Sequence, residues 1–218
     1  MSAILKPAVA ARLATLFSPA NNPCADMQPA ERLARLRTHY ADCMRCPLAT
    51  QGRQQVVFGE GEPDAAIMFI GEGPGRDEDL LGRPFVGRSG KLLTKMLDAL
   101  GFTRDRVFIS NSVRCRPPAN RQPTPEETAL CISHILLREI SIVRPRIICT
   151  LGATATNALI EQNKSLSSIR GQVIQTDFFS LLPTFHPAYL LRNPAATTIV
   201  ETDFLKLLPF LESKKKCG

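Results

Sequence analysis

Four cysteines stand in two separated pairs and could together hold a metal centre. Cys43 and Cys46 form a C-x2-C pair, and Cys115 and Cys131 flank the proline-rich stretch CRPPANRQPTPEETALC. Four thiolates from two such pairs can enclose a zinc ion or an iron–sulfur cluster. Pro47 and the lack of a second C-x2-C favour the cluster over a zinc ribbon. Scattered free cysteines in the core are the alternative.

A glycine-rich segment at residues 71–90, GEGPGRDEDLLGRPFVGRSG, indicates backbone that approaches a ligand closely. It is not a P-loop, because Phe85 and Leu92 stand where that motif needs Gly and Ser or Thr. It is not a dinucleotide fingerprint either, because the third glycine is missing, so a nucleotide-binding enzyme is disfavoured. A pocket for a planar ring fits better, lined by the amides of Gly71–Gly73 with Phe85 as a flat face.

Four short apolar runs predict buried strands, and helical patterns lie between them. The expected strands are Ala66–Ile70, Val107–Ser110, Arg146–Leu151 and Leu181–Phe185. The expected helices are Gly87–Leu100, a helix from the N-cap Thr124 to about Val143, one after Gly152, and one over about Ala195–Leu211. This alternation predicts an α/β fold with a parallel sheet covered on both faces.

The polar and glycine-rich segments follow the ends of these strands. They are Gly71–Gly75, Asn111–Arg116, Gly152 and His186–Arg192. Because ligands of an open parallel sheet bind beyond the carboxyl ends of its strands, we expect these loops to form one active site. Ser89, at the start of a helix, can offer its hydroxyl and amide to a phosphate nearby.

Composition limits the class of protein. Of 218 residues 44% are hydrophobic and 22% charged, which suits one well-buried domain, and the net charge of +7 suits nucleic acid. No run of about 18 apolar residues occurs, which excludes a membrane span, and the N-terminus lacks the order of a secretory signal. We therefore expect a cytoplasmic protein whose clustered thiols stay reduced and available to metal.

Three motifs, GEGPGRDEDLLGRPFVGRSGKLL, ISNSVRCRPP and FHPAYLLRNP, occur in this order together with the four cysteines. In this combination the chain resembles a family 4 uracil-DNA glycosylase, the iron–sulfur type, over about residues 40–210. The resemblance implies a three-layer α/β/α sandwich with a central four-stranded parallel sheet. It also implies a [4Fe–4S] cluster on Cys43, Cys46, Cys115 and Cys131, and excision of uracil from single- and double-stranded DNA.

The same resemblance divides the chain into three regions. Residues 1–28 would be a loosely ordered extension with at most one short helix, and residues 29–212 the glycosylase domain with its cluster. Residues 213–218 would be a basic tail in solvent. We expect a monomer, and a sliding-clamp partner has no support in the sequence.

The resemblance also assigns the uracil pocket. It implies that the base is bound by Gly71, Glu72, Gly73, Phe85, Asn111 and His186, with Phe85 stacked on the ring. Two positions depart from the family pattern, since Gly73 stands where Ala is common and Ala188 where Ser is common. The second change removes a hydroxyl that could hold a phosphate.

A base inside the duplex is out of reach, so the nucleotide must be flipped into the pocket. Tyr189, Leu190 and Leu191 are the candidates for an apolar wedge that fills the vacated stack, and Arg192 and Ser89 for phosphate contacts. The structural alternative is that the three wedge candidates pack as the first turn of the last helix.

Cleavage of the glycosidic bond produces a sugar cation and a uracil anion. We expect His186 to donate to uracil O2, for which a neutral imidazole suffices. Asn111 can pair with both O4 and N3–H of uracil, and it rejects cytosine, which presents the opposite pattern.

The residue that orients water is harder to choose. Relatives in the wider superfamily carry an aspartate at the third position of the first motif, where this chain has Gly73. Glu78, expected to face the sugar, is the first candidate. Glu72 is the second, with the alternative that it shapes the pocket at the C5 edge of uracil.

Two other functions stay open from the sequence. A family X relative becomes covalently joined to uracil-DNA through a histidine in a basic insert, but residues 114–122, RCRPPANRQ, contain no histidine. A non-catalytic iron–sulfur module would bind DNA without making abasic sites, and the intact Phe85, Asn111 and His186 argue against it.

Overall fold

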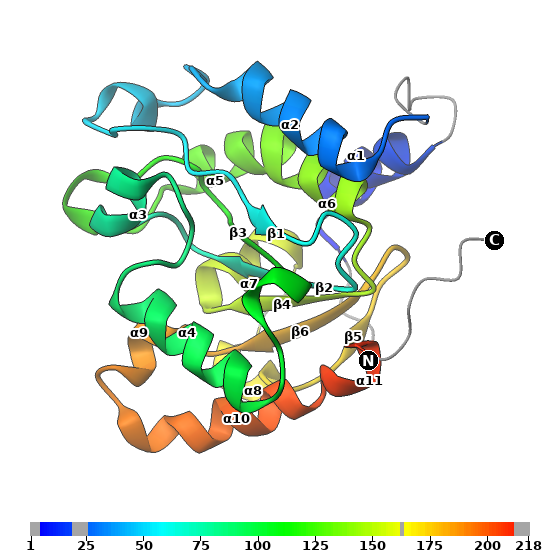
Figure 1. Ribbon diagram of the computed structural model, residues 1–218, viewed down its shortest axis with the longest axis vertical. Coiled ribbons are helices and arrows are strands. Elements are labelled where there is room, and N and C mark those ends of the chain that lie inside the picture. The colour runs from blue at the N-terminus through cyan, green and yellow to red at the C-terminus, as the bar shows by residue number, and fades with distance from the viewer. Residues whose placement is uncertain (1–4, 19–25, 162–163, 212–218) are drawn as a thin grey trace.

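The structure is a computed structural model, and it describes residues 5–18, 26–161 and 164–211. The described residues form one six-stranded sheet in the order β1-β3-β2-β4-β6-β5, with helices on both faces (Figure 1). The strands are β1 (Glu60–Gly61), β2 (Ile67–Gly71), β3 (Phe108–Asn111), β4 (Ile147–Leu151), β5 (Ile174–Gln175) and β6 (Ser180–Thr184).

The four long strands are those that the apolar runs predict, and they run parallel. β1 and β5 add an antiparallel pairing at each edge, so the sheet is mixed and has two strands more than expected. Each of these edge strands has two residues, which is too short to show an alternating pattern in the sequence. The α/β class and the helix–sheet–helix layering are confirmed.

Side chains of the central strands alternate between two cores. In β2, Met68 and Ile70 pack into the first core, and Ile67 and Phe69 into the second, all without solvent exposure. A parallel strand covered on both faces needs apolar residues at every position, which explains why these strands are continuous apolar runs.

The helices cover the sheet in two layers. In Figure 1, α1 (Pro7–Phe17), α2 (Pro29–Tyr40), α5 (Pro125–Cys131) and α6 (Leu137–Val143) lie above the sheet, and α4 (Arg88–Ala99), α9 (Pro187–Leu190) and α10 (Thr197–Leu205) lie below it. The remaining helices are α3 (Arg76–Leu81), α7 (Ala153–Leu159), α8 (Leu166–Ile169) and α11 (Leu208–Leu211). Short 3-10 turns occur at Pro47–Thr50, Arg104–Arg106, Pro118–Asn120 and Pro194–Ala196.

The helix that begins after Thr124 starts as predicted and then changes its winding. Thr124 Oγ1 accepts from the main-chain N–H of Glu127 at 3.2 Å, and the Glu127 carboxylate accepts from the N–H of Thr124 at 2.7 Å. Directly after Cys131 the chain forms a π-helical turn, Ile132–Leu136, before α6 continues. Such turns are rare and occur mostly at functional sites, and this one adjoins a candidate metal ligand.

The segment before residue 29 differs from a loosely held extension where the structure describes it. Leu5, Val9 and Leu13 are buried in the first core, and the N–H of Lys6 donates to the carbonyl of Leu159 at 2.9 Å. The apolar side of α1 therefore forms part of the domain's packing. The boundary at residue 29 stays a prediction, and the basic tail at 213–218 lies outside the described residues.

The last predicted helix is divided into two. Pro194–Ala196 forms a 3-10 turn, α10 ends at Leu205, and α11 starts anew at Leu208. Pro209 explains the break, because proline has no N–H to donate to the carbonyl four residues earlier, which is that of Leu205 at the end of α10. In the described part of the chain, each helix is too short or too polar to cross a bilayer.

Candidate base pocket and metal centre

The carboxyl ends of β2 and β3 bring Gly71, Phe85 and Asn111 together. Gly71 pairs with Asn111 in the parallel ladder. A Cβ at Gly71 would lie 2.4 Å from Cζ of Phe85 and 2.6 Å from Oδ1 of Asn111, so any side chain there would collide with the ring and the amide. The next glycine is also confined, because a Cβ at Gly73 would lie 2.7 Å from Val113.

Asn111 carries an unused acceptor in this space. It is 2% exposed, and its Oδ1 has no hydrogen-bond partner within the described ranges. Buried polar atoms in native proteins are nearly always paired, so an orphaned oxygen of this kind marks the place of a ligand's donor. This rim therefore offers a specific acceptor for an N–H donor, which the described residues leave unpaired.

Phe85 is held in an unusual backbone conformation. Its φ is 53°, in the left-handed region that side chains other than glycine avoid, at a cost of about 1–3 kcal/mol. Arg104 Nη1 donates to its carbonyl at 3.0 Å, and a Cβ at Gly90 would lie 2.0 Å from that carbonyl. The surrounding structure thus fixes the ring, whose centroid lies 5.7 Å from that of His186.

His186 is a neutral imidazole with a defined tautomer. It is the N-cap of α9, and its Nδ1 accepts from the main-chain N–H of Ala188 at 3.0 Å. Burial, and then the nearby charge of Arg192, lower the pKa of His186 to about 4. With Nδ1 used as an acceptor, the proton sits on Nε2, which is free to act as a donor.

Glu78 is not placed as expected. Its Oε1 accepts from the N–H groups of Val86 and Gly87 at 3.0 and 2.8 Å, and its Oε2 from that of Gly75 at 3.1 Å. The buried carboxylate therefore ties the two ends of the glycine-rich loop together, where it holds Phe85 in place. The expectation that Glu78 faces the sugar and orients water does not agree with this arrangement.

Glu72 has a different environment. Thr154 Oγ1 donates to Glu72 Oε2 at 2.6 Å, and Gln122 Nε2 donates to Thr154 Oγ1 at 2.8 Å. Thr154 lies in the first turn of α7, two residues after Gly152, whose φ is 92°. The turn after β4 thus fixes one oxygen of Glu72, which stays half-buried beside the pocket.

The three wedge candidates are separated by burial. Leu190 is 2% exposed and packs in the second core, so it cannot enter DNA, and its assignment as a DNA contact is corrected. Tyr189 and Leu191 are 38% and 39% exposed on either side of it. Tyr189 and Leu190 belong to the separate short helix α9 and Leu191 caps its end, so the three do not form the first turn of the last helix.

A cleft of about 340 Å³ lies beside α9. Ser89, Leu191 and Arg192 line it together with Arg76 and Arg88, which the sequence reasoning did not single out. The acids Asp77 and Glu78 line it as well, and main-chain amides already bind the Glu78 carboxylate. Arg88 is the first residue of α4, so its charge adds to that of a helix N-terminus. The cleft is suited to an anionic backbone.

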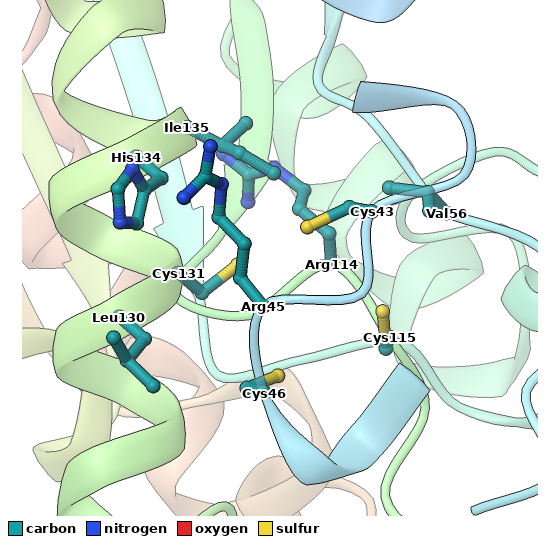
Figure 2. Close-up of a pocket in the computed structure, with 10 residues that line it drawn as sticks. All are labelled: Cys43, Arg45, Cys46, Val56, Arg114, Cys115, Leu130, Cys131, His134 and Ile135. Atoms are coloured by element: carbon teal, nitrogen blue, oxygen red, sulfur yellow. The ribbon is translucent and has the colours of Figure 1, made fainter. Parts of the chain in front are cut away.

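The four predicted metal ligands surround one interior cavity. Figure 2 shows the sulfur atoms of Cys43, Cys46, Cys115 and Cys131 facing a common space, which Arg114 also lines. Cys43 follows α2, Cys46 precedes a 3-10 turn, Cys115 follows β3, and Cys131 ends α5. Burial raises the pKa of Cys46, Cys115 and Cys131, the last to about 12.

The spacing of these sulfurs bears on the kind of metal centre. Among the described residues, three or more acidic, thiol or imidazole groups do not converge tightly enough to hold one metal ion. Zinc needs all four ligands at about 2.3 Å from one centre, whereas an iron–sulfur cluster spreads its cysteines over several irons. Arg53 Nη1 donates to Cys115 Sγ at 3.0 Å, which suits a sulfur that carries negative charge.

Comparison with known proteins agrees with this geometry. Residues 58–212 match the family model described as the uracil DNA glycosylase superfamily. The type-4 uracil-DNA glycosylase of Thermotoga maritima is 47% identical over 79% of this chain and 91% of its own length, and that of Sulfurisphaera tokodaii 43% identical over 81% and 84%. The chain belongs to the type-4 uracil-DNA glycosylases.

A solved structure of Pedobacter heparinus SMUG2 covers 69% of this glycosylase and 77% of its own chain, with a TM-score of 0.44 and 14% identity. The family assignment made from the three motifs is confirmed by the sequence relatives and the family model. In this type-4 glycosylase Gly71, Phe85 and Asn111 lie close together, with His186 beside Phe85, while Glu78 is bonded to main-chain amides and Leu190 is buried in the second core.

Proposed function

We propose that this glycosylase flips uracil out of DNA and hydrolyses its N-glycosidic bond, leaving an abasic site. The observation that carries the proposal is the buried Oδ1 of Asn111, which has no partner among the described residues and lies close to Gly71 and the ring of Phe85. The proposal agrees with the names of its type-4 relatives.

Asn111 would select the base. Its Oδ1 accepts from N3–H of uracil, and its amide donates to O4, while Phe85 stacks on the ring. Cytosine offers an acceptor at N3 and a donor at C4, so both polar atoms of the buried amide would lose their partners. A site built in this way rejects the wrong base by about 10⁴–10⁵.

His186 would stabilise the departing base. As the glycosidic bond breaks, negative charge gathers on uracil O2, and the Nε2–H of the neutral imidazole is the donor for it. A single donor of this kind is worth about 3–4 kcal/mol in the transition state. Because the pKa of His186 is about 4, it needs no change of protonation between neutral and weakly acidic pH.

Glu72 would orient the attacking water, now that Glu78 is occupied with the loop. Its hydrogen bond from Thr154 fixes one carboxylate oxygen, and a carboxylate has further lone pairs for a water molecule. Glu72 thus replaces Glu78 as the first candidate for this role, and Glu78 becomes a positioning residue.

The arginine-lined cleft would bind the DNA backbone. Arg76, Arg88 and Arg192 can neutralise phosphates, which supplies affinity without sequence preference. Flipping a base costs a few kcal/mol, and the exposed Tyr189 and Leu191 can fill the vacated stack.

The four cysteines would hold a [4Fe–4S] cluster whose role is structural. The four sulfur atoms that face one cavity and the Arg53 hydrogen bond to Cys115 fit such a group. When bound, the cluster joins the segment after α2 to the loop after β3 and to α5. The cytoplasmic location, the monomeric state and the question of a clamp partner stay predictions.

An excision assay tests the proposal. The iron-loaded protein is incubated with single- and double-stranded oligonucleotides that contain one uracil, with thymine and cytosine oligonucleotides as controls. We expect abasic product from the uracil strands alone, and no product from Asn111→Ala on the same time scale. Uncut uracil strands would refute the proposal, and a protein–DNA adduct on a denaturing gel would favour the family X reaction.

A further inference from the structure

Arg114 is a buried cation that lies between the base pocket and the four cysteines. It is 1% exposed, and its Nη2 pairs with Oε2 of Glu139 at 2.6 Å. Its Nη1 donates to the main-chain oxygen of Asn111. A buried ion pair adds little net stability compared with apolar residues of the same size, so its value lies in what it holds in place.

Glu139 connects this pair to the strand that carries Asn111. Its Oε2 also accepts from Ser110 Oγ at 2.6 Å, and its Oε1 accepts from the N–H of Gly59 at 3.0 Å. Ser110 immediately precedes Asn111 in β3. The carboxylate therefore fixes the residue before Asn111, while the guanidinium fixes the carbonyl of Asn111 itself. Together they set the peptide from which the carboxamide projects.

The same arginine contacts the cysteine cavity. It lines that cavity with the four cysteines, and Cys115 is the next residue in the chain (Figure 2). Burial raises the pKa of Cys131, while the charge of Arg114 and a hydrogen bond from its main chain act in the opposite direction. Arg114 Nε is buried without an acceptor in the described part of the chain, and a sulfur atom of a bound cluster would supply one.

The chain between these two ends has little freedom. Ser112 donates its N–H to the carbonyl of Gly71 at 2.8 Å, and Val113 donates to that of Glu72 at 3.1 Å. The segment from Asn111 to Cys115 is thus fastened along the first motif. A displacement at the cysteine end can reach Asn111 through this segment and through the guanidinium.

We propose that Arg114 is a positioning residue that couples the cysteine centre to the selection of uracil. With Glu139 it holds the Asn111 peptide in the orientation that pairs the carboxamide with the base. The inference rests on the proposed role of Asn111. It means that loosening of the metal centre weakens uracil binding before the domain unfolds.

The test removes both charges at once. In Arg114→Met/Glu139→Gln no lone charge stays buried, and the glutamine oxygen can still accept from the N–H of Gly59. We expect the iron-loaded variant to bind uracil-free DNA normally. Its affinity for free uracil and its single-turnover excision should each fall by about tenfold or more. On an Asn111→Ala background, whose slow residual excision must be followed over much longer times, the same pair should change either quantity less than about twofold, because Arg114 acts through Asn111.

Two matched variants and one spectroscopic measurement complete the test. Arg114→Lys should stay within about threefold of the wild type, because an ammonium group has three donors for the same two acceptors. Arg83→Met, which removes an exposed ion-paired arginine, should match the wild type. The rate at which a chelator bleaches the iron absorbance should rise in the Met/Gln pair.

The outcomes are distinguishable from failure of the proposed function. A loss that persists in full on the Asn111→Ala background, or an unchanged rate of iron release, overturns the coupling. If the Met/Gln pair does not fold, Glu139→Gln alone is measured in the wild-type and Asn111→Ala backgrounds, with the same expected results. If instead wild-type protein leaves uracil uncut, or Asn111→Ala cuts as fast as the wild type, the proposed function itself is wrong.

Discussion

Glu78 and Glu72 should respond in opposite ways to substitution by glutamine. Glu78 accepts three main-chain hydrogen bonds at 2.8–3.1 Å, and a hydrogen bond to a charged group is worth about 1.5–3 kcal/mol. Glutamine keeps one acceptor oxygen without its charge and turns an NH₂ group towards one of the three donors. We therefore expect Glu78→Gln to lower the free energy of unfolding by about 2–4 kcal/mol.

In a chain of this size that loss corresponds to a fall in Tm of about 5–15 °C. Single-turnover excision, measured well below the Tm, should fall less than about tenfold, because the carboxylate holds the loop without contacting the attacking water. Glu72→Gln is the matched control, since it makes the same change of atom and charge. It should keep its Tm within about 2 °C and lose about 10²–10⁴ in rate, as expected for a residue that activates water.

Calorimetry and rapid-quench excision on one uracil oligonucleotide check both variants under the same conditions. The reasoning would be refuted if Glu78→Gln kept its Tm and lost more than a hundredfold in rate. In that case the carboxylate would leave its three amide donors during the reaction, and the structural role assigned to it would be wrong.

Three further predictions concern other parts of the site. The pKa of His186 lies at about 4 in the folded chain, below the ordinary value of 6.5. The neutral imidazole therefore contributes up to about 3 kcal/mol to the free energy of unfolding. This contribution is complete above pH 6.5 and is lost as the pH falls towards 4. Denaturant titrations at several pH values should show this loss of stability between pH 6.5 and 4. The variant His186→Asn, whose side chain is neutral throughout, should not show it. Leu190→Ala should cost about 2–5 kcal/mol of stability, because this side chain is buried. Leu191→Ala should leave stability unchanged and slow excision from duplex DNA more than from single strands. Equal effects of the two substitutions on the Tm would contradict the difference in burial. Cys115→Ser should give colourless, poorly folded protein, and a stable variant with full iron content would reassign that ligand.

Much of the fold could be predicted from local patterns. The apolar runs of β2, β3, β4 and β6 are continuous because both faces of each strand are buried. The Thr124 capping box was visible because its two partners are three residues apart in the sequence. The edge strands β1 and β5 were missed, since two residues carry no periodicity. The core position of α1 was missed as well, because a modest amphipathic stretch does not show what covers it.

The roles of the acids and leucines show the limit of the sequence. Glu78 and Glu72 lie in one acidic, glycine-rich segment, and Leu190 and Leu191 are neighbours in one motif. Composition does not separate the members of either pair. Their roles follow from which amides, hydroxyls or core side chains surround each of them after folding.

The sequence by itself determined the chemistry available to this protein: the order of its motifs, the four thiols and the carboxamide, aromatic ring and imidazole at strand ends. Only the tertiary structure decided how each group is used. It leaves the Asn111 oxygen without a partner among the described residues, commits Glu78 to three amides and joins Arg114 to Glu139 across 25 positions of sequence. The physical reason is that burial and hydrogen-bond partners, which decide whether a polar group is structural or free to react, come from segments that are distant along the chain.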